Sequence, residues 1–172
     1  MRDLTTADAV RAFMVEVGRL ARRPVNVYFT GGVTAVLHGW RDTTVDIDLK
    51  SDVSIEGLSR LKEKLGINIE LASPDDFIPE LPGWRERSVY IGREGQVSYF
   101  HYDPYAQVLA KLERGHAQDL ADVSSMFDGG LVEARGLLDL FERVEPDLDR
   151  YPAIDGASFR RAVEDVVRGR LG

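Results

Sequence analysis

The sequence predicts an α+β fold, close to α/β, with a small mixed β-sheet, flanking helices and a helical C-terminal part. Strand-like and helical stretches alternate over residues 1–103, as is typical of a sheet covered by helices. Only helical periodicity remains from residue 104 onward. The 172-residue chain is 44% hydrophobic, so it can bury a core. We therefore expect an α/β core at residues 1–103 and a helical part at residues 104–172, packed on the same domain.

The first part of the chain supplies three strands and the helices around them. Apolar residues recur at helical spacing over residues 10–20, and Thr5 or Thr6 can cap this helix. Residues 25–30 (VNVYFT) are rich in β-branched and aromatic side chains, which predicts the first strand. The other elements expected here are a short helix at 33–38, a second strand at 44–49, a helix at 55–65 capped by Ser54, and a third strand at 67–71.

The second part begins with a turn-rich stretch and ends in helices. A serine, a proline and two acidic residues at 73–76 predict the start of a further helix. Residues 87–92 and 96–102 alternate well enough to form a hairpin around residues 93–95. The helices expected beyond this hairpin lie at 104–114, 117–127, 132–143 and 157–168.

Composition excludes several classes of function. The chain has no cysteine, so neither disulfides nor thiolate metal sites are available. No apolar run approaches the length of a membrane span and the N-terminus lacks the apolar core of a signal peptide, so we expect a cytoplasmic protein without membrane contact. The formal charge of −7 argues against a large nucleic-acid-binding surface while leaving local basic patches open.

Acidic side chains alternate with apolar ones in the second strand. Asp46 and Asp48 point to one face because strand side chains alternate, while Ile47 and Leu49 point to the other. If the third strand is a neighbour with its apolar side on the core, Glu70 joins the aspartates. Three converging carboxylates suit two Mg²⁺ ions in phosphoryl transfer. The alternative is that the Asp-x-Asp pattern is only the polar face of an amphipathic strand.

A glycine pair, Gly31 and Gly32, ends the first strand. Glycine carries no Cβ and tolerates positive φ, so such a turn lets the backbone approach a phosphate chain. The alternative is that the pair only allows strand and helix to pack tightly.

These features lie within a longer set of residues with a family resemblance. The set comprises Gly31-Gly32, Ala35, His38-Gly39, Arg41, Thr43 or Thr44, Asp46-Ile47-Asp48-Leu49, Lys111-Leu112-Glu113-Arg114-Gly115 and Asp119-Leu120-Ala121-Asp122. It resembles the nucleotidyltransferase superfamily, in particular the bacterial AbiEii and MenT toxin type, and most closely a short uncharacterised subgroup of that superfamily. The resemblance spans about residues 25–128.

The resemblance implies Mg²⁺-dependent transfer of a nucleoside monophosphate from a nucleoside triphosphate, and it implies roles for individual residues. Asp46 and Asp48 match the metal ligands, and Glu70 stands as a candidate third carboxylate. Thr44 matches a small hydroxyl residue two positions before the first aspartate. Lys111 matches a lysine that contacts the triphosphate. Asp119 or Asp122 matches an acidic helical residue near the site.

The helical spacing around Lys111 is consistent with that role. Lys111 and Arg114 lie three residues apart, as do Asp119 and Asp122, so each pair occupies neighbouring helix surface. Lysine and arginine suit phosphate, and the aspartates could orient them. The alternative is that these residues only form surface salt bridges between two adjacent helices.

The sequence leaves the identity of the acceptor hydroxyl open. It could belong to a tRNA 3′ end, a protein or a small molecule such as an aminoglycoside. The resemblance favours a toxin with an antitoxin partner. The competing hypothesis is a non-catalytic nucleotide-binding or protein-interaction module that kept the fold; the intact Asp46 and Asp48 count against it.

Overall fold

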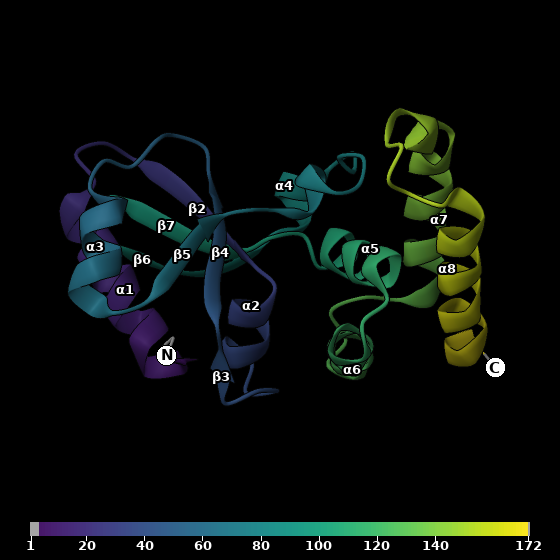
Figure 1. Ribbon diagram of the computed structural model, residues 1–172, viewed down its shortest axis with the longest axis horizontal. Coiled ribbons are helices and arrows are strands. Elements are labelled where there is room, and N and C mark those ends of the chain that lie inside the picture. Colours follow the sequence, from purple (N-terminus) through teal and green to yellow (C-terminus); the bar gives the residue numbers. More distant parts are fainter. Residues whose placement is uncertain (1–3, 172) are drawn as a thin grey trace. The chain divides into compact units, whose positions relative to one another are not determined.

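The computed structural model describes residues 4–171 and confirms the α+β class (Figure 1). The chain divides into two compact units. The sheet unit comprises Met1–Ser73 and Ser88–Tyr102, and the helical unit comprises Pro74–Arg87 and Asp103–Gly172. Within residues 4–171, no helix has both the length and the apolar character needed to cross a membrane.

The sheet unit contains a five-stranded mixed sheet with the strand order β5-β4-β2-β7-β6. Its strands are β2 (Val25–Thr30), β4 (Asp46–Ser51), β5 (Asn68–Leu71), β6 (Val89–Glu94) and β7 (Val97–His101). The central strand β2 is antiparallel to β4 and parallel to β7. The pair β4–β5 is parallel, and β6–β7 is the expected hairpin, with β6 extending to Glu94.

The single strand expected at residues 44–49 is divided in the structure. β3 (Thr43–Thr44) leaves the main sheet and pairs with β1 (Thr5–Thr6), and β4 begins at Asp46. Thr6 also caps the first helix, as expected, because its hydroxyl accepts a hydrogen bond from the Ala9 N–H at 3.2 Å. The chain therefore changes partner just before the two aspartates.

Three helices belong to the sheet unit: α1 (Ala7–Leu20), α2 (Gly32–Leu37) and α3 (Leu58–Leu65). The apolar face of α1 joins the hydrophobic core on one face of the sheet, where Ile47 and Leu49 are 0% and 1% exposed. The expected start of α3 near residue 55, capped by Ser54, is wrong. Gly57 has φ +91°, a left-handed conformation that ends the preceding turn, so the helix begins at Leu58.

The helical unit is built from α4 (Trp84–Arg87), α5 (Pro104–Arg114), α6 (Ala117–Asp128), α7 (Ala134–Val144) and α8 (Gly156–Leu171), with 3₁₀ turns at Pro74–Asp76 and Glu145–Arg150. The helix expected after residues 73–76 is only the first of these 3₁₀ turns, and α4 was not expected. Arg87 and Asp103 join the two segments of the unit through an ion pair of 2.7 Å. Asp103, fully buried, also caps α5 by accepting from the Tyr105 N–H at 3.0 Å.

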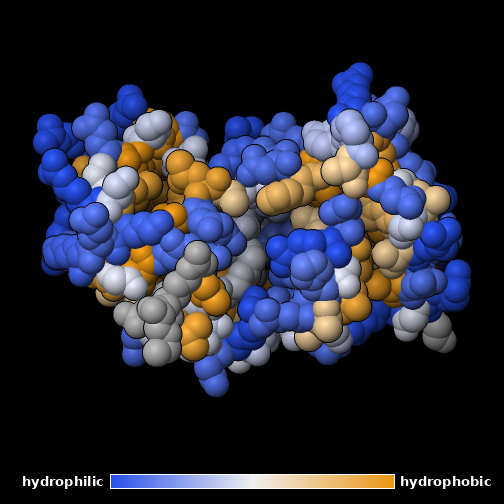
Figure 2. All heavy atoms as spheres, in the orientation of Figure 1, coloured by the Kyte–Doolittle hydropathy of each residue, from blue (hydrophilic) through white to orange (hydrophobic). Residues whose placement is uncertain are grey.

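Hydrophilic side chains cover much of the face seen in the space-filling view (Figure 2), in keeping with the charged fraction of 30%. The apolar residues of α7 and α8 pack against each other inside the helical unit, where the Phe141 and Phe159 rings meet edge-on with their centroids 4.9 Å apart.

Candidate metal centre

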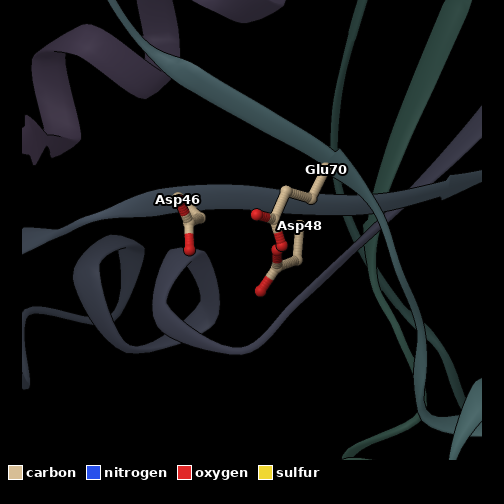
Figure 3. A group of neighbouring side chains, drawn as sticks. All are labelled: Asp46, Asp48 and Glu70. Carbon is tan, nitrogen blue, oxygen red and sulfur yellow. The ribbon is translucent and has the colours of Figure 1, made fainter. Parts of the chain in front are cut away.

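Three carboxylates meet on the face of the sheet opposite to the α1 core. Asp46 and Asp48 lie on β4, and Glu70 lies directly across from Asp48 on the parallel strand β5. Each residue offers a carboxylate oxygen within 4.8 Å of the others. Figure 3 shows the Asp48 and Glu70 side chains directed toward each other, with Asp46 on the same side of the strand. β4 and β5 are therefore neighbours, as the convergence of these residues requires.

The alternation of β4 explains why the carboxylates stay accessible. Ile47 and Leu49 are buried in the core, so the intervening Asp46 and Asp48 must face away from it. Both aspartates are partly exposed, and Glu70, on the edge strand, is exposed. The sheet thus carries three acidic side chains outside its hydrophobic core, and one Asp48 oxygen, Oδ1, is itself buried.

Asn68 lies on the same face of the sheet as the three carboxylates and bonds two of them. It lies across from Asp46 on β5, and its side-chain amide donates hydrogen bonds to Asp46 Oδ1 and, at 3.3 Å, to Glu70 Oε1. The sequence pattern places Asn68 on the same face as Glu70 but gives it no role. The signal that could have identified it is its position two residues before the third carboxylate.

Gly31 borders the carboxylates directly. It follows Thr30, which is paired with Asp48 across β2 and β4. Gly31 has φ +62°, a conformation that glycine adopts without strain. A Cβ at this position would lie 3.2 Å from Asp48 Oδ2, so a side chain here would crowd the carboxylate. Glycine therefore keeps space open beside Asp48.

Gly32 has a different neighbour. A Cβ at this position would lie 2.0 Å from Thr44 Oγ1 and 2.7 Å from Thr44 Cβ. Thr44 is buried, so it has little freedom to move aside. The tight packing of α2 against β3 is therefore sufficient to explain why position 32 is glycine.

We expect Gly32→Ala to destabilise the protein by about 1–3 kcal/mol, because the added methyl group overpacks the contact with Thr44. Gly92→Ala is the matched control, since a Cβ at Gly92 in β6 would meet nothing within 4 Å. Thermal melts of the two variants make the comparison. Equal melting temperatures for Gly32→Ala and wild type would show that α2 does not pack as described.

A buried polar contact lies next to the strand end that carries Gly31. Thr34 Oγ1, in α2, is 3.0 Å from His101 Nδ1, and the centroids of the His101 and His38 rings are 4.5 Å apart. Burial, and secondarily the charge of His38, lower the pKa of His101 to about 3. His101 is therefore neutral near pH 7, and its ring joins the end of β7 to α2.

This shift predicts a pH dependence of stability. Between pH about 6.5 and about 3 the unfolded chain binds a proton at His101 that the folded chain does not. The contribution of His101 to folding stability is complete above that window. It decreases by up to about 1.4 kcal/mol for each unit by which the pH is lowered through the window. We expect His101→Asn, which keeps a polar group near Thr34, to flatten this part of the profile in chemical denaturation. The exposed His116→Asn is the control, and identical profiles for both variants would contradict the assignment.

The helical unit holds a separate network of buried charges. Lys111 Nζ lies 3.0 Å from Asp122 Oδ2 and 3.5 Å from Asp119 Oδ1, and all three residues are buried. Arg114 donates two hydrogen bonds of 2.8 Å to the Asp119 carboxylate. Burial raises the pKa of Asp119, but Arg114 and Lys111 outweigh it and hold that pKa below its usual value. The structure thus brings Lys111, Asp119 and Asp122 together within this unit.

The donor set of the sheet unit fits a hard divalent cation. Mg²⁺ prefers oxygen ligands at about 2.0–2.1 Å, so opposed ligand oxygens lie about 4.2 Å apart. The three carboxylates, grouped within 4.8 Å, need only small side-chain adjustments to match this spacing. Among the residues described here, this is the one group of three or more acidic, histidine or cysteine side chains with such convergence.

Comparisons with known proteins agree with this chemistry. A family model described as nucleotidyltransferase of unknown function (DUF6036) matches residues 10–143, which include every candidate site residue named above. No curated protein and no solved structure gives a significant match. The match covers well over half of the chain, and it supports the resemblance to the nucleotidyltransferase superfamily. The chain therefore belongs to the DUF6036 family of nucleotidyltransferases of unknown function.

Proposed function

We propose that this protein is a Mg²⁺-dependent nucleotidyltransferase that transfers a nucleoside monophosphate from a nucleoside triphosphate to an acceptor hydroxyl. The observation that carries the proposal is the group of three carboxylates within 4.8 Å on one sheet face, in a chain that belongs to a nucleotidyltransferase family. Neither part is sufficient alone, since exposed acidic groups are common and a family name does not establish activity.

Asp46, Asp48 and Glu70 would hold the metal, which we expect to be two Mg²⁺ ions. Bound Mg²⁺ would neutralise the triphosphate and the charge that develops during transfer. The acceptor oxygen forms a bond to the α-phosphorus while the bond from the α-phosphorus to the bridging oxygen breaks, and pyrophosphate leaves. Glu70, the most exposed of the three, either completes the metal shell or accepts the proton of the acceptor hydroxyl.

On the resemblance, we assign nucleotide binding to Gly31, Gly32, Thr44, Lys111, Asp119 and Asp122. Gly31 leaves space beside Asp48, where the phosphate chain could approach the backbone. Gly32 and Thr44, in contact with each other, would shape the adjoining turn. On the resemblance, Lys111 contacts the triphosphate, and its distances to Asp119 and Asp122 suit these carboxylates to orienting the ammonium group.

For the acceptor we propose tRNA or protein, in the setting of a toxin with a cognate antitoxin. The resemblance to AbiEii and MenT proteins supports this choice. The charge of −7 is less favourable for RNA than for a protein, or for a cationic small molecule such as an aminoglycoside.

Labelling can test both the reaction and the acceptor. The protein is incubated with Mg²⁺, cell extract and each of the four nucleoside triphosphates labelled at the α-phosphate. Products are then treated separately with ribonuclease and with protease, and the small-molecule fraction is collected. Label is expected in a macromolecule that only one of the two treatments degrades.

The outcome separates the proposed enzyme from a non-catalytic module. A label confined to unreacted triphosphate would contradict the proposal. Calorimetry that then shows neither nucleotide nor Mg²⁺ binding would favour a protein-interaction module. Labelled small molecules would keep the enzyme and replace the acceptor.

A further inference from the structure

The carboxylates of Asp46, Asp48 and Glu70 lie close together, and when ionised none of them can donate a hydrogen bond to another. Three carboxylates with oxygens within 4.8 Å repel one another when ionised. Each carboxylate also rotates about its side-chain torsions, and a metal ligand must be held in one orientation. A donor between the carboxylates would offset the repulsion and restrict the rotation.

Asn68 provides such a donor. A side-chain amide has two N–H groups, so one nitrogen can serve two acceptors. In the structure, Asn68 Nδ2 bonds both Asp46 Oδ1 and Glu70 Oε1. This orientation follows from chemistry, because ionised carboxylates only accept and the amide oxygen would repel them.

The pattern of contacts divides the carboxylate oxygens into two sets. The amide takes one oxygen of Asp46 and one of Glu70, which leaves the second oxygen of each residue for another partner. The β4–β5 register fixes this arrangement, since Asn68 is paired with Asp46 and lies two residues before Glu70 on the same face.

We propose that Asn68 is a positioning residue that orients Asp46 and Glu70 for a divalent cation. The assignment rests on the proposed metal site. Loss of an outer partner of a metal ligand costs about 10–100-fold in metal affinity, which sets the size of effect expected here.

The chain offers a matched control in Asn26. Asn26 lies in β2, and its amide also bonds a carboxylate, with Nδ2 at 3.1 Å from Asp52 Oδ2. Asp52 is not among the three converging carboxylates. Asn26→Ala therefore removes the same kind of hydrogen bond without touching the proposed metal ligands.

The test measures Mn²⁺ affinity by calorimetry, with Mg²⁺ in competition, in wild type, Asn68→Ala, Asn68→Thr and Asn26→Ala. We expect Asn68→Ala to weaken the affinity by about 10–100-fold. Asn68→Thr keeps a strand-favouring residue with a single hydroxyl donor, so its affinity should fall between wild type and Asn68→Ala. Asn26→Ala should bind like wild type. Thermal melts in chelator show whether each variant is folded.

The outcomes distinguish this inference from the proposed function. If wild type binds neither metal, the metal site itself fails and the role of Asn68 fails with it. If wild type binds but Asn68→Ala and Asn26→Ala match it, the metal site stands and Asn68 has no positioning role. If Asn68→Ala is unfolded, Asn68→Thr decides: wild-type affinity in that variant overturns the inference.

Discussion

Replacing Asp46 or Asp48 by asparagine is expected to abolish nucleotidyl transfer while the protein stays folded. Asparagine keeps the shape of aspartate and removes the charge, and both side chains are partly exposed rather than packed in the core. Loss of an outer partner of a metal ligand costs about 10–100-fold, so loss of a ligand's charge should cost more. The measurement is the rate of label transfer from an α-labelled nucleoside triphosphate, beside a thermal melt.

Asp42→Asn is the control for this pair. Asp42 is an exposed aspartate a few residues before Asp46, so the substitution makes the same charge change outside the carboxylate group. We expect its rate to match wild type. Near-normal transfer by Asp46→Asn or Asp48→Asn would remove the metal-site interpretation of that residue.

Lys111→Ala is expected to produce the largest loss of stability in the helical unit. Its ammonium is 3.0 Å from Asp122 and 3.5 Å from Asp119, and the Lys111 side chain is only 11% exposed. Asp119 keeps its pairing with Arg114, whereas buried Asp122 loses the ammonium group at 3.0 Å. Breaking a buried ion pair in this way costs about 3–5 kcal/mol. Chemical denaturation measures this loss, with Arg135→Ala, an exposed position on α7, as a control expected within about 0.5 kcal/mol of wild type.

A double variant strengthens this test. Lys111→Met with Asp122→Asn removes both charges of the closest pair and should recover part of the lost stability. No loss in Lys111→Ala would contradict the buried ion pair. A nucleotide titration of the folded variants tests the proposed contact between Lys111 and the triphosphate. Weakened nucleotide affinity supports this contact, whereas unchanged nucleotide affinity shows that Lys111 acts only in the ion-pair network with Asp119 and Asp122.

Sequence periodicity predicts that strands carry the candidate site, but it places the second strand at residues 44–49 rather than at Asp46–Ser51. In β4 the apolar positions Ile47 and Leu49 define the core face, so the orientation of Asp46 and Asp48 follows from alternation. The position of Glu70 needs one further condition, that β4 and β5 are neighbours in parallel register. The shared alternation of apolar residues in the two strands supports this condition. It cannot fix the register, which depends on contacts across the sheet.

Other features depend on tertiary contacts that leave no pattern in the sequence. The β1–β3 pair is two residues long, too short for alternation to be recognised. The start of α3 depends on the left-handed conformation of Gly57, which glycine permits but does not require. The spacing of Lys111, Asp119 and Asp122 predicts neighbouring charges on helices, whereas their burial comes from packing within the helical unit.

The role of Asn68 shows the same limit at the site itself. Alternation predicts the sheet face on which Asn68 lies. The pairing of β4 with β5 determines which two carboxylates its amide bonds. Gly32 is a related case, because its contact with Thr44 joins α2 to a strand that pairs outside the main sheet.

We propose that Asp46, Asp48 and Glu70 form the metal centre of a nucleotidyltransferase. The most direct measurement is transfer of α-phosphate label, with release of pyrophosphate, by wild type in Mg²⁺, by wild type in chelator and by Asp48→Asn in Mg²⁺. We predict transfer and pyrophosphate release only in the first case. Equal transfer in chelator, or by Asp48→Asn, would contradict the claim.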